Sequence, residues 1–116
     1  MRVILTGASG RMGRQMLALF QSEGHIEVIA VDKNVGGGEL GCIVARYSDI
    51  CDVKERADAI VDFSLHTATC EVVESAVKRN IPLVVATTGH TAYERGYIEN
   101  ASAQIPVFMA SNMSIA

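Results

Sequence analysis

The chain alternates short apolar runs with longer amphipathic segments. The runs are rich in β-branched residues and bounded by glycine, proline or polar residues, which predicts buried parallel strands. They cover Arg2–Thr6 and residues 26–32, 59–63, 82–86 and 106–110. Apolar residues at helical spacing lie between several of these runs. They predict helices over residues 10–24, 67–78 and 91–103.

The pattern is weakest between residues 33 and 56. Residues 33–41 contain the triplet Gly36-Gly37-Gly38 and no apolar period, so we expect a mobile loop. We interpret Ile43–Tyr47 as a strand and residues 48–56 as a weak helical turn. Strands that alternate with helices predict a parallel sheet with right-handed crossovers and helices on both faces. The expected fold is a doubly wound Rossmann arrangement, with residues 1–116 forming one domain.

Composition excludes several classes of function. The 116 residues include 10 Lys+Arg and 13 Asp+Glu, for a net charge of -3, and no clustered basic face that would predict a nucleic-acid partner. No apolar run is long enough to cross a bilayer, and the N-terminus lacks the layout of a signal peptide, so we expect a cytoplasmic protein without membrane contact. The 3 Cys and 3 His are too scattered for a metal site, and we expect the cysteines to be small buried apolar residues.

A glycine motif connects the first strand to the first helix. Gly7, Gly10 and Gly13 stand at i, i+3 and i+6, a variant of the G-x-G-x-x-G dinucleotide fingerprint. We expect Gly7 to allow the sharp exit from the strand, Gly10 to let backbone N–H groups approach a pyrophosphate, and Gly13 to let the helix lie close to the sheet. Met12 stands where a Walker A loop would begin its Gly-Lys-Ser/Thr, so that motif is excluded.

An acidic residue follows the second predicted strand. Asp32 lies 19 residues after Gly13, where a carboxylate can accept hydrogen bonds from the adenosine ribose hydroxyls. Lys33 beside it could attract a 2′-phosphate, so the choice between NAD and NADP stays open. The plainer alternative is a glycine-rich turn followed by a solvated carboxylate, with no ligand.

Further polar clusters follow the later strands, at residues 62–64, 86–90 and 110–114. Together with Gly-Arg-Met-Gly at residues 10–13, they make the chain resemble the dihydrodipicolinate reductase family of bacterial lysine (diaminopimelate) biosynthesis. The resemblance covers the whole chain but only the first part of the family's length. A second domain, which binds substrate and forms the homotetramer, is expected to be absent here.

The resemblance implies a cofactor, NADH or NADPH, and a set of contacts. It places Gly7 to Met12 around the pyrophosphate, Asp32 and Lys33 at the adenosine ribose or its phosphate, and Phe63 beside the adenine. It places residues 86–88 and 110–113 against the nicotinamide. The implied cofactor-binding residues are Gly7, Ala8, Ser9, Gly10, Arg11, Met12, Asp32, Lys33, Phe63, Ala86, Thr87, Thr88, Ala110, Ser111, Asn112 and Met113.

The family transfers a hydride from the coenzyme to 4-hydroxy-tetrahydrodipicolinate, giving tetrahydrodipicolinate. Its catalytic His and Lys belong to the missing domain, and no residue here matches them. We therefore expect this chain to bind the coenzyme without turnover.

Two alternatives stay open at this point. One is a non-catalytic domain that senses NAD(P), and the other is the cofactor domain of another two-domain dehydrogenase, such as a homoserine or aspartate dehydrogenase. Short-chain dehydrogenase chemistry is excluded, because no tyrosine is followed by lysine in the required Tyr-x-x-x-Lys spacing.

Overall fold

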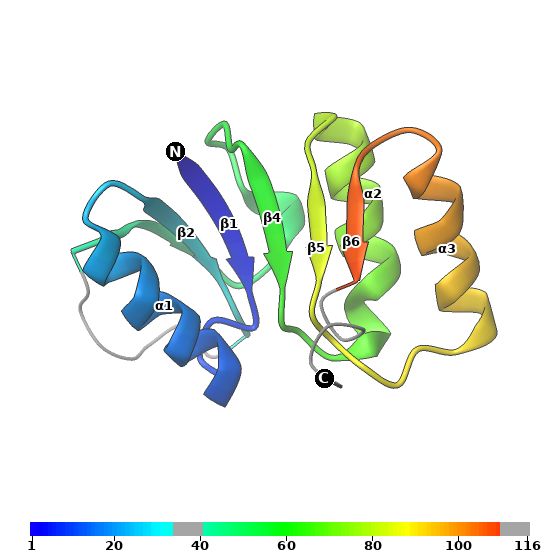
Figure 1. Cartoon of the computed structure of the whole chain (residues 1–116), viewed down its shortest axis with the longest axis horizontal. Coiled ribbons are helices and arrows are strands. Elements are labelled where there is room, and N and C mark those ends of the chain that lie inside the picture. Colours follow the sequence, from blue (N-terminus) through cyan, green and yellow to red (C-terminus); the bar gives the residue numbers. More distant parts are fainter. Residues whose placement is uncertain (34–40, 110–116) are drawn as a thin grey trace.

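A parallel sheet forms the centre of the molecule (Figure 1). The computed structural model describes residues 1–33 and 41–109, and within these ranges the sheet has 6 strands in the order β3-β2-β1-β4-β5-β6. Every neighbouring pair is parallel. The strands are β1 (Arg2–Thr6), β2 (Glu27–Val31), β3 (Ile43–Tyr47), β4 (Ala59–Asp62), β5 (Leu83–Val85) and β6 (Val107–Met109). This order is that of the doubly wound Rossmann fold and confirms the predicted fold class.

Helices cover both faces of the sheet. Helix α1 (Arg11–Glu23) packs on one face, where Leu17 joins Leu5 and Val28 in a small core. Helices α2 (Thr69–Arg79) and α3 (Ala92–Ser102) pack on the opposite face over a larger core that includes Ile4 and Ile60. Figure 1 shows α2 behind β5 and β6, with α3 beside it. Neighbouring residues such as Ile4 and Leu5 serve different cores because successive strand side chains point to opposite faces.

Helix α1 lies within the predicted range of residues 10–24, and a glycine caps each end. Gly10 is the N-cap, and Gly24 is the C-cap in the left-handed conformation with φ 78°. Glycine is favoured there because it has no Cβ to clash with the following carbonyl. The predicted strands after Tyr47 and the predicted α3 lie where expected, each within about one residue at either end.

The segment after β3 differs from the prediction. Instead of a helical turn over residues 48–56, only a 3-10 turn, η1 (Ile50–Asp52), is present, and Val53 returns to extended backbone. Ile50 and Val53 are buried in the larger core, so packing of these two side chains determines the local path. Likewise, a 3-10 turn η2 (His66–Ala68) precedes α2, which therefore begins two residues later than expected.

Two other expectations have different outcomes. The prediction that all cysteines are buried is wrong, because Cys51 is exposed and Cys42 and Cys70 are partly exposed. The predicted loop at 33–41 falls almost entirely outside the described residues, as does Ala110 at the end of the last predicted strand. In the part of the chain that the structure describes, no helix is long and apolar enough to cross a membrane.

Candidate functional site

The glycine turn lies at the carboxyl edge of the sheet, where β1 exits toward α1. Gly7 has φ +67°, and its N–H donates to the Val31 carbonyl oxygen at 2.9 Å. A Cβ on Gly7 would lie 2.4 Å from the backbone oxygen of Phe63, and a Cβ on Gly13 would lie 2.2 Å from the backbone oxygen of Gly7. Both positions therefore require glycine, since main chain occupies the space that a side chain would need.

Helix α1 begins without a side-chain cap. Its N-cap, Gly10, is exposed and has no side chain to accept from the first N–H groups, and no acidic residue stands in the first turn. The N-terminal end of a helix carries a partial positive charge and unsatisfied N–H donors. This end of α1 is thus suited to an anion such as a phosphate.

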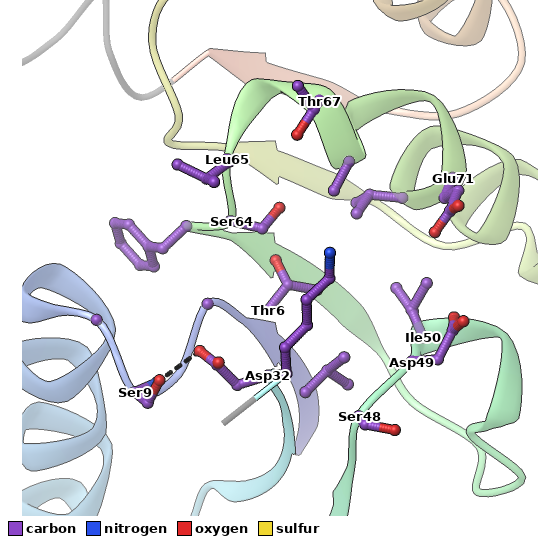
Figure 2. Close-up of a pocket in the computed structure, with 17 residues that line it drawn as sticks. Thr6, Ser9, Asp32, Ser48, Asp49, Ile50, Ser64, Leu65, Thr67 and Glu71 are labelled. Atoms are coloured by element: carbon purple, nitrogen blue, oxygen red, sulfur yellow. Dashed lines mark hydrogen bonds between the residues drawn. The ribbon is translucent and has the colours of Figure 1, made fainter. Parts of the chain in front are cut away.

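Asp32 connects the end of β2 to the glycine turn. Its Oδ2 accepts from the Ser9 N–H at 3.0 Å, an interaction that Figure 2 shows. Asp32 also donates its own N–H to the Tyr47 carbonyl oxygen at 3.0 Å, so the ends of β2 and β3 lie side by side. The carboxylate is held at the rim of the sheet, close to the turn that would hold a phosphate.

A pocket of about 410 Å³ opens between these elements. It lies at the sheet's reversal point, between β1 and β4, where open α/β sheets bind ligands. Its wall combines apolar side chains with polar and charged ones, and a small-molecule site needs both, the apolar surface for contact and the polar groups for orientation. The lining residues are Thr6, Gly7, Ser9, Gly10, Val31, Asp32, Lys33, Ser48, Asp49, Ile50, Phe63, Ser64, Leu65, Thr67, Ala68, Glu71 and Val72.

A buried carboxylate fixes the wall between β1 and β4. Asp62 has no exposed surface, and its Oδ1 accepts from the Thr6 hydroxyl at 2.5 Å, the Ser64 N–H at 2.9 Å and the Ser64 hydroxyl at 2.5 Å. Thr6 and Ser64 both line the pocket. Asp62 itself does not, so its role at this site is to position those two side chains.

A second polar group lies along the same edge, in the loop between β5 and α3. The Ala86 N–H donates to the Asp62 carbonyl oxygen at 2.9 Å. Thr87 is buried, and its hydroxyl lies 3.1 Å from His90 Nε2, while Thr88 is exposed. Gly89 turns the chain with φ +81°.

A contact between His66 and Glu94 joins the start of α3 to η2, the turn that follows β4. His66 Nδ1 lies 2.9 Å from Glu94 Oε1, and Glu94 also accepts from the Thr91 N–H at 2.8 Å in a capping box at the start of α3. The Thr91 N–H, and after it His66, lower the pKa of the Glu94 carboxyl. The carboxylate form of Glu94 is therefore favoured at neutral pH.

The structure groups only some of the expected site residues in the pocket. Gly7, Ser9, Gly10, Asp32, Lys33 and Phe63 line it. Ala8 is buried away from it, and Arg11, Met12, Ala86, Thr87 and Thr88 are not among its lining residues. Ala110, Ser111, Asn112 and Met113 lie outside the described residues.

Sequence reasoning missed several lining residues, in particular Ser48, Asp49 and Glu71. Ser48 and Asp49 directly follow β3, so the rule that ligands bind at the carboxyl ends of strands could have found them. Glu71 lies in the first turn of α2, and its place depends on how α2 packs against η1. No local pattern predicts that contact.

The parallel strand order, the glycine turn and the pocket together define a nucleotide-binding Rossmann domain. The family model described as dihydrodipicolinate reductase, N-terminus, matches residues 1–113. The chain therefore belongs to the dihydrodipicolinate reductase family, as the N-terminal, nucleotide-binding domain. The sequence had left open that the chain is the cofactor domain of another two-domain dehydrogenase. The match to the dihydrodipicolinate reductase model does not support that alternative.

Curated relatives carry the same family name. A 4-hydroxy-tetrahydrodipicolinate reductase from Caldanaerobacter subterraneus subsp. tengcongensis is 42% identical over 115 residues, which are 98% of this chain and 44% of that protein. One from Thermomicrobium roseum is 35% identical over 121 residues, covering 99% of this chain and 47% of that protein. The chain thus spans less than half the length of these relatives.

Solved structures share the fold. The dipicolinate-bound dihydrodipicolinate reductase from Paenisporosarcina sp. TG-14 has a TM-score of 0.72 at 18% identity, over 89% of this chain and 43% of that one. An oxidoreductase from Agrobacterium radiobacter, in complex with NAD+, L-tartaric acid and magnesium, has a TM-score of 0.71 at 17% identity, over 91% of this chain and 34% of that one. At these identities the likeness concerns the fold.

Proposed function

We propose that this chain is the coenzyme-binding domain of a 4-hydroxy-tetrahydrodipicolinate reductase and that it binds NADH or NADPH. The observation that carries the proposal is the backbone cradle at Gly7 and Gly13, joined by the Ser9–Asp32 hydrogen bond to the rim of one pocket. A Cβ at either glycine would fill the space inside this cradle. The carboxylate of Asp32 lies beside the cradle. The family match and the NAD+ complex of a protein with the same fold support the same ligand class.

The residues of this chain divide the task of binding. The uncapped N-terminal end of α1 would hold the pyrophosphate, and the carboxylate of Asp32 would accept from ribose hydroxyls. The apolar side chains of Phe63, Val31, Ile50 and Val72 line the pocket and offer a surface for the adenine. Residues 86–88, together with residues 110–113, would meet the nicotinamide.

When bound, the coenzyme supplies the hydride that reduces the cyclic dicarboxylic substrate of this family. The residues of this chain would hold and orient the coenzyme. The proton donor and substrate contacts would come from a second domain, which would also form the tetramer. This chain alone would bind coenzyme and reduce nothing.

Titration of the chain with NADH and with NADPH tests the proposal through the fluorescence of the reduced nicotinamide. The chain has 0 Trp, so energy transfer from tryptophan does not contribute. We expect saturable binding that ADP-ribose competes away, and no oxidation of coenzyme when 4-hydroxy-tetrahydrodipicolinate is added. Absence of binding at millimolar coenzyme, with a native circular dichroism spectrum, would overturn the coenzyme assignment. Measurable turnover would overturn the proposal that this chain alone binds coenzyme without reducing the substrate.

A further inference from the structure

The wall between β1 and β4 directs its hydrogen-bond donors away from the pocket. Ser64 lines the pocket just after β4 and is half-buried. Its N–H and its hydroxyl both donate to Asp62 Oδ1, at 2.9 and 2.5 Å. Thr6, at the end of β1, is buried and donates its hydroxyl to the same oxygen at 2.5 Å. Figure 2 shows Thr6 and Ser64 at this wall, and the donors of both residues are thus occupied by one oxygen atom.

Burial makes these hydrogen bonds costly to break. Asp62 has no exposed surface, and its other oxygen, Oδ2, has no hydrogen-bond partner among the residues that the structure describes. A buried carboxylate is stabilised by the donors around it, and the loss of one such donor costs more free energy than the loss of a bond between neutral groups. We therefore expect Thr6 and Ser64 to keep donating to Asp62 when a ligand enters the pocket.

The Ser64 hydroxyl can then only accept from a ligand. A serine hydroxyl has one proton and two lone pairs, and the proton of Ser64 is directed to Asp62. The Ser64 N–H is directed to Asp62 as well. The start of α1 at Gly10 has the opposite character, because its N–H groups have no side-chain cap and suit an anion. The pocket therefore has one edge that favours anions and one wall that favours hydrogen-bond donors.

We propose that Asp62 is a positioning residue that makes Ser64 a hydrogen-bond acceptor, so that this wall binds a donor group of the coenzyme and leaves the phosphates to α1. The inference rests on the proposed function, since it concerns the same pocket. Two parts of the coenzyme carry donors that fit, the adenine amino group and the ribose hydroxyls, whereas the pyrophosphate carries none at neutral pH. Asp62 acts through Ser64 and Thr6, because it does not itself line the pocket.

The test measures the binding of NADH and of modified forms of NADH by nicotinamide fluorescence. One form has a carbonyl oxygen in place of the adenine amino group, and the others each lack one ribose hydroxyl. In wild type, loss of the donor that contacts Ser64 should weaken binding roughly fivefold, the effect of one hydrogen bond. In Ser64→Ala the same loss should have no effect, because the partner is already gone. The form that behaves in this way identifies the donor.

Ser102→Ala is the matched control for Ser64→Ala. Ser102 is an exposed serine on α3 whose hydroxyl donates to the Glu99 carbonyl oxygen at 2.6 Å, and it does not line the pocket. This variant should show the same cost as wild type for every modified form. A reduced cost in the control as well would overturn the assignment of the contact to Ser64.

Inorganic pyrophosphate, as a competitor of NADH, tests the polarity of the wall. Ser64→Ala should leave the affinity for pyrophosphate unchanged, because the Ser64 hydroxyl does not donate to an anion. Asp62→Ala releases that hydroxyl, so pyrophosphate should bind several-fold more tightly, and the addition of Ser64→Ala should remove part of the gain. A gain that persists in full would show that only the lost charge matters. If Asp62→Ala does not fold, the Ser64→Ala measurements decide alone.

The outcomes separate the two proposals. The positioning role is overturned if no modification of NADH costs less in Ser64→Ala than in wild type. It is also overturned if Ser64→Ala weakens pyrophosphate binding, because the hydroxyl would then donate to an anion. Both results leave the coenzyme-binding function intact. Failure of the folded wild-type chain to bind NADH would overturn the proposed function itself.

Discussion

The two halves of the candidate site are built in different ways. At the proposed adenosine half, main chain packs on main chain: the Gly7 turn lies against the Phe63–Ser64 peptide, and α1 lies against the turn. At the proposed nicotinamide half, the loop between β5 and α3 is held by side chains, through the Thr87–His90 and His66–Glu94 pairs. A Cβ on Gly89 would find its nearest neighbour, His66 Cδ2, 3.9 Å away.

This difference shows which half tolerates change. Backbone packed against backbone leaves no room to adjust, so a side chain added in the proposed adenosine half must displace main chain. Side-chain contacts on a loop can break singly and at smaller cost. Four variants test the contrast, from the largest expected effect to the smallest.

Gly7→Ala should cause the greatest loss, because its Cβ meets the Phe63 carbonyl at 2.4 Å in a backbone conformation that alanine rarely adopts. We expect it to destabilise the fold by about 3 kcal/mol or more. Chemical denaturation measures this free energy of unfolding. Gly96→Ala is the control, since a Cβ there has nothing within 4 Å, and removal of a glycine from α3 should raise stability by up to about 1 kcal/mol. Equal effects of the two changes would contradict the tight packing inferred for the turn.

Asp32→Asn should weaken NADH binding by about 1.5 to 3 kcal/mol, the range for a hydrogen bond to a charged group. The change leaves the shape of the side chain nearly unaltered, so an unfolding curve close to wild type is expected. Titration with NADH and NADPH should show the larger loss for NADH. Equal losses for both coenzymes would argue against a bond from this carboxylate to the ribose hydroxyls.

Thr88→Ala acts on the other half of the site. Thr88 is exposed, so its removal should leave the free energy of unfolding unchanged. If its hydroxyl meets the nicotinamide, NADH affinity should fall by about 1 kcal/mol, and ADP-ribose affinity should stay as in wild type. The two ligands share the adenosine half, and only NADH carries nicotinamide. A parallel loss for both would show that Thr88 acts on the adenosine half or on folding.

Glu94→Gln should produce the smallest effect, and one that depends on pH. Because the folded state lowers the pKa of Glu94, its ionised form stabilises the fold above the ordinary carboxyl pKa of about 4. That stabilisation disappears as the pH falls through the lowered pKa. Melting temperatures of wild type and variant should therefore differ at pH 7 and converge in acid. Glu99 is an exposed acid on the same helix, so Glu99→Gln should not change the melting temperature at pH 7. If the Glu94→Gln variant still differs from wild type in melting temperature in acid, packing and not charge is responsible.

Much of this protein could be predicted from neighbouring residues alone. The strands and helices follow from apolar runs and helical spacing, and the caps of α1, Gly10 and Gly24, stand at the limits of the predicted helix over residues 10–24. The glycine motif with Asp32 indicated a dinucleotide site, and its order with the later polar clusters indicated the family that the comparison then matched. These features depend on residues close in sequence, where local periodicity and turn chemistry decide the structure.

The tertiary structure decided which residues share the pocket. Asp49 and Glu71 join Asp32 there although the three residues come from separate segments of the chain. Arg11 and Met12 are not part of the pocket wall although they belong to the glycine motif. The hydrogen bond from Ser9 to Asp32 spans 23 positions and exists because β2 pairs with β1. Contacts of this kind arise from strand pairing and helix packing between distant segments, and no short stretch of sequence contains them.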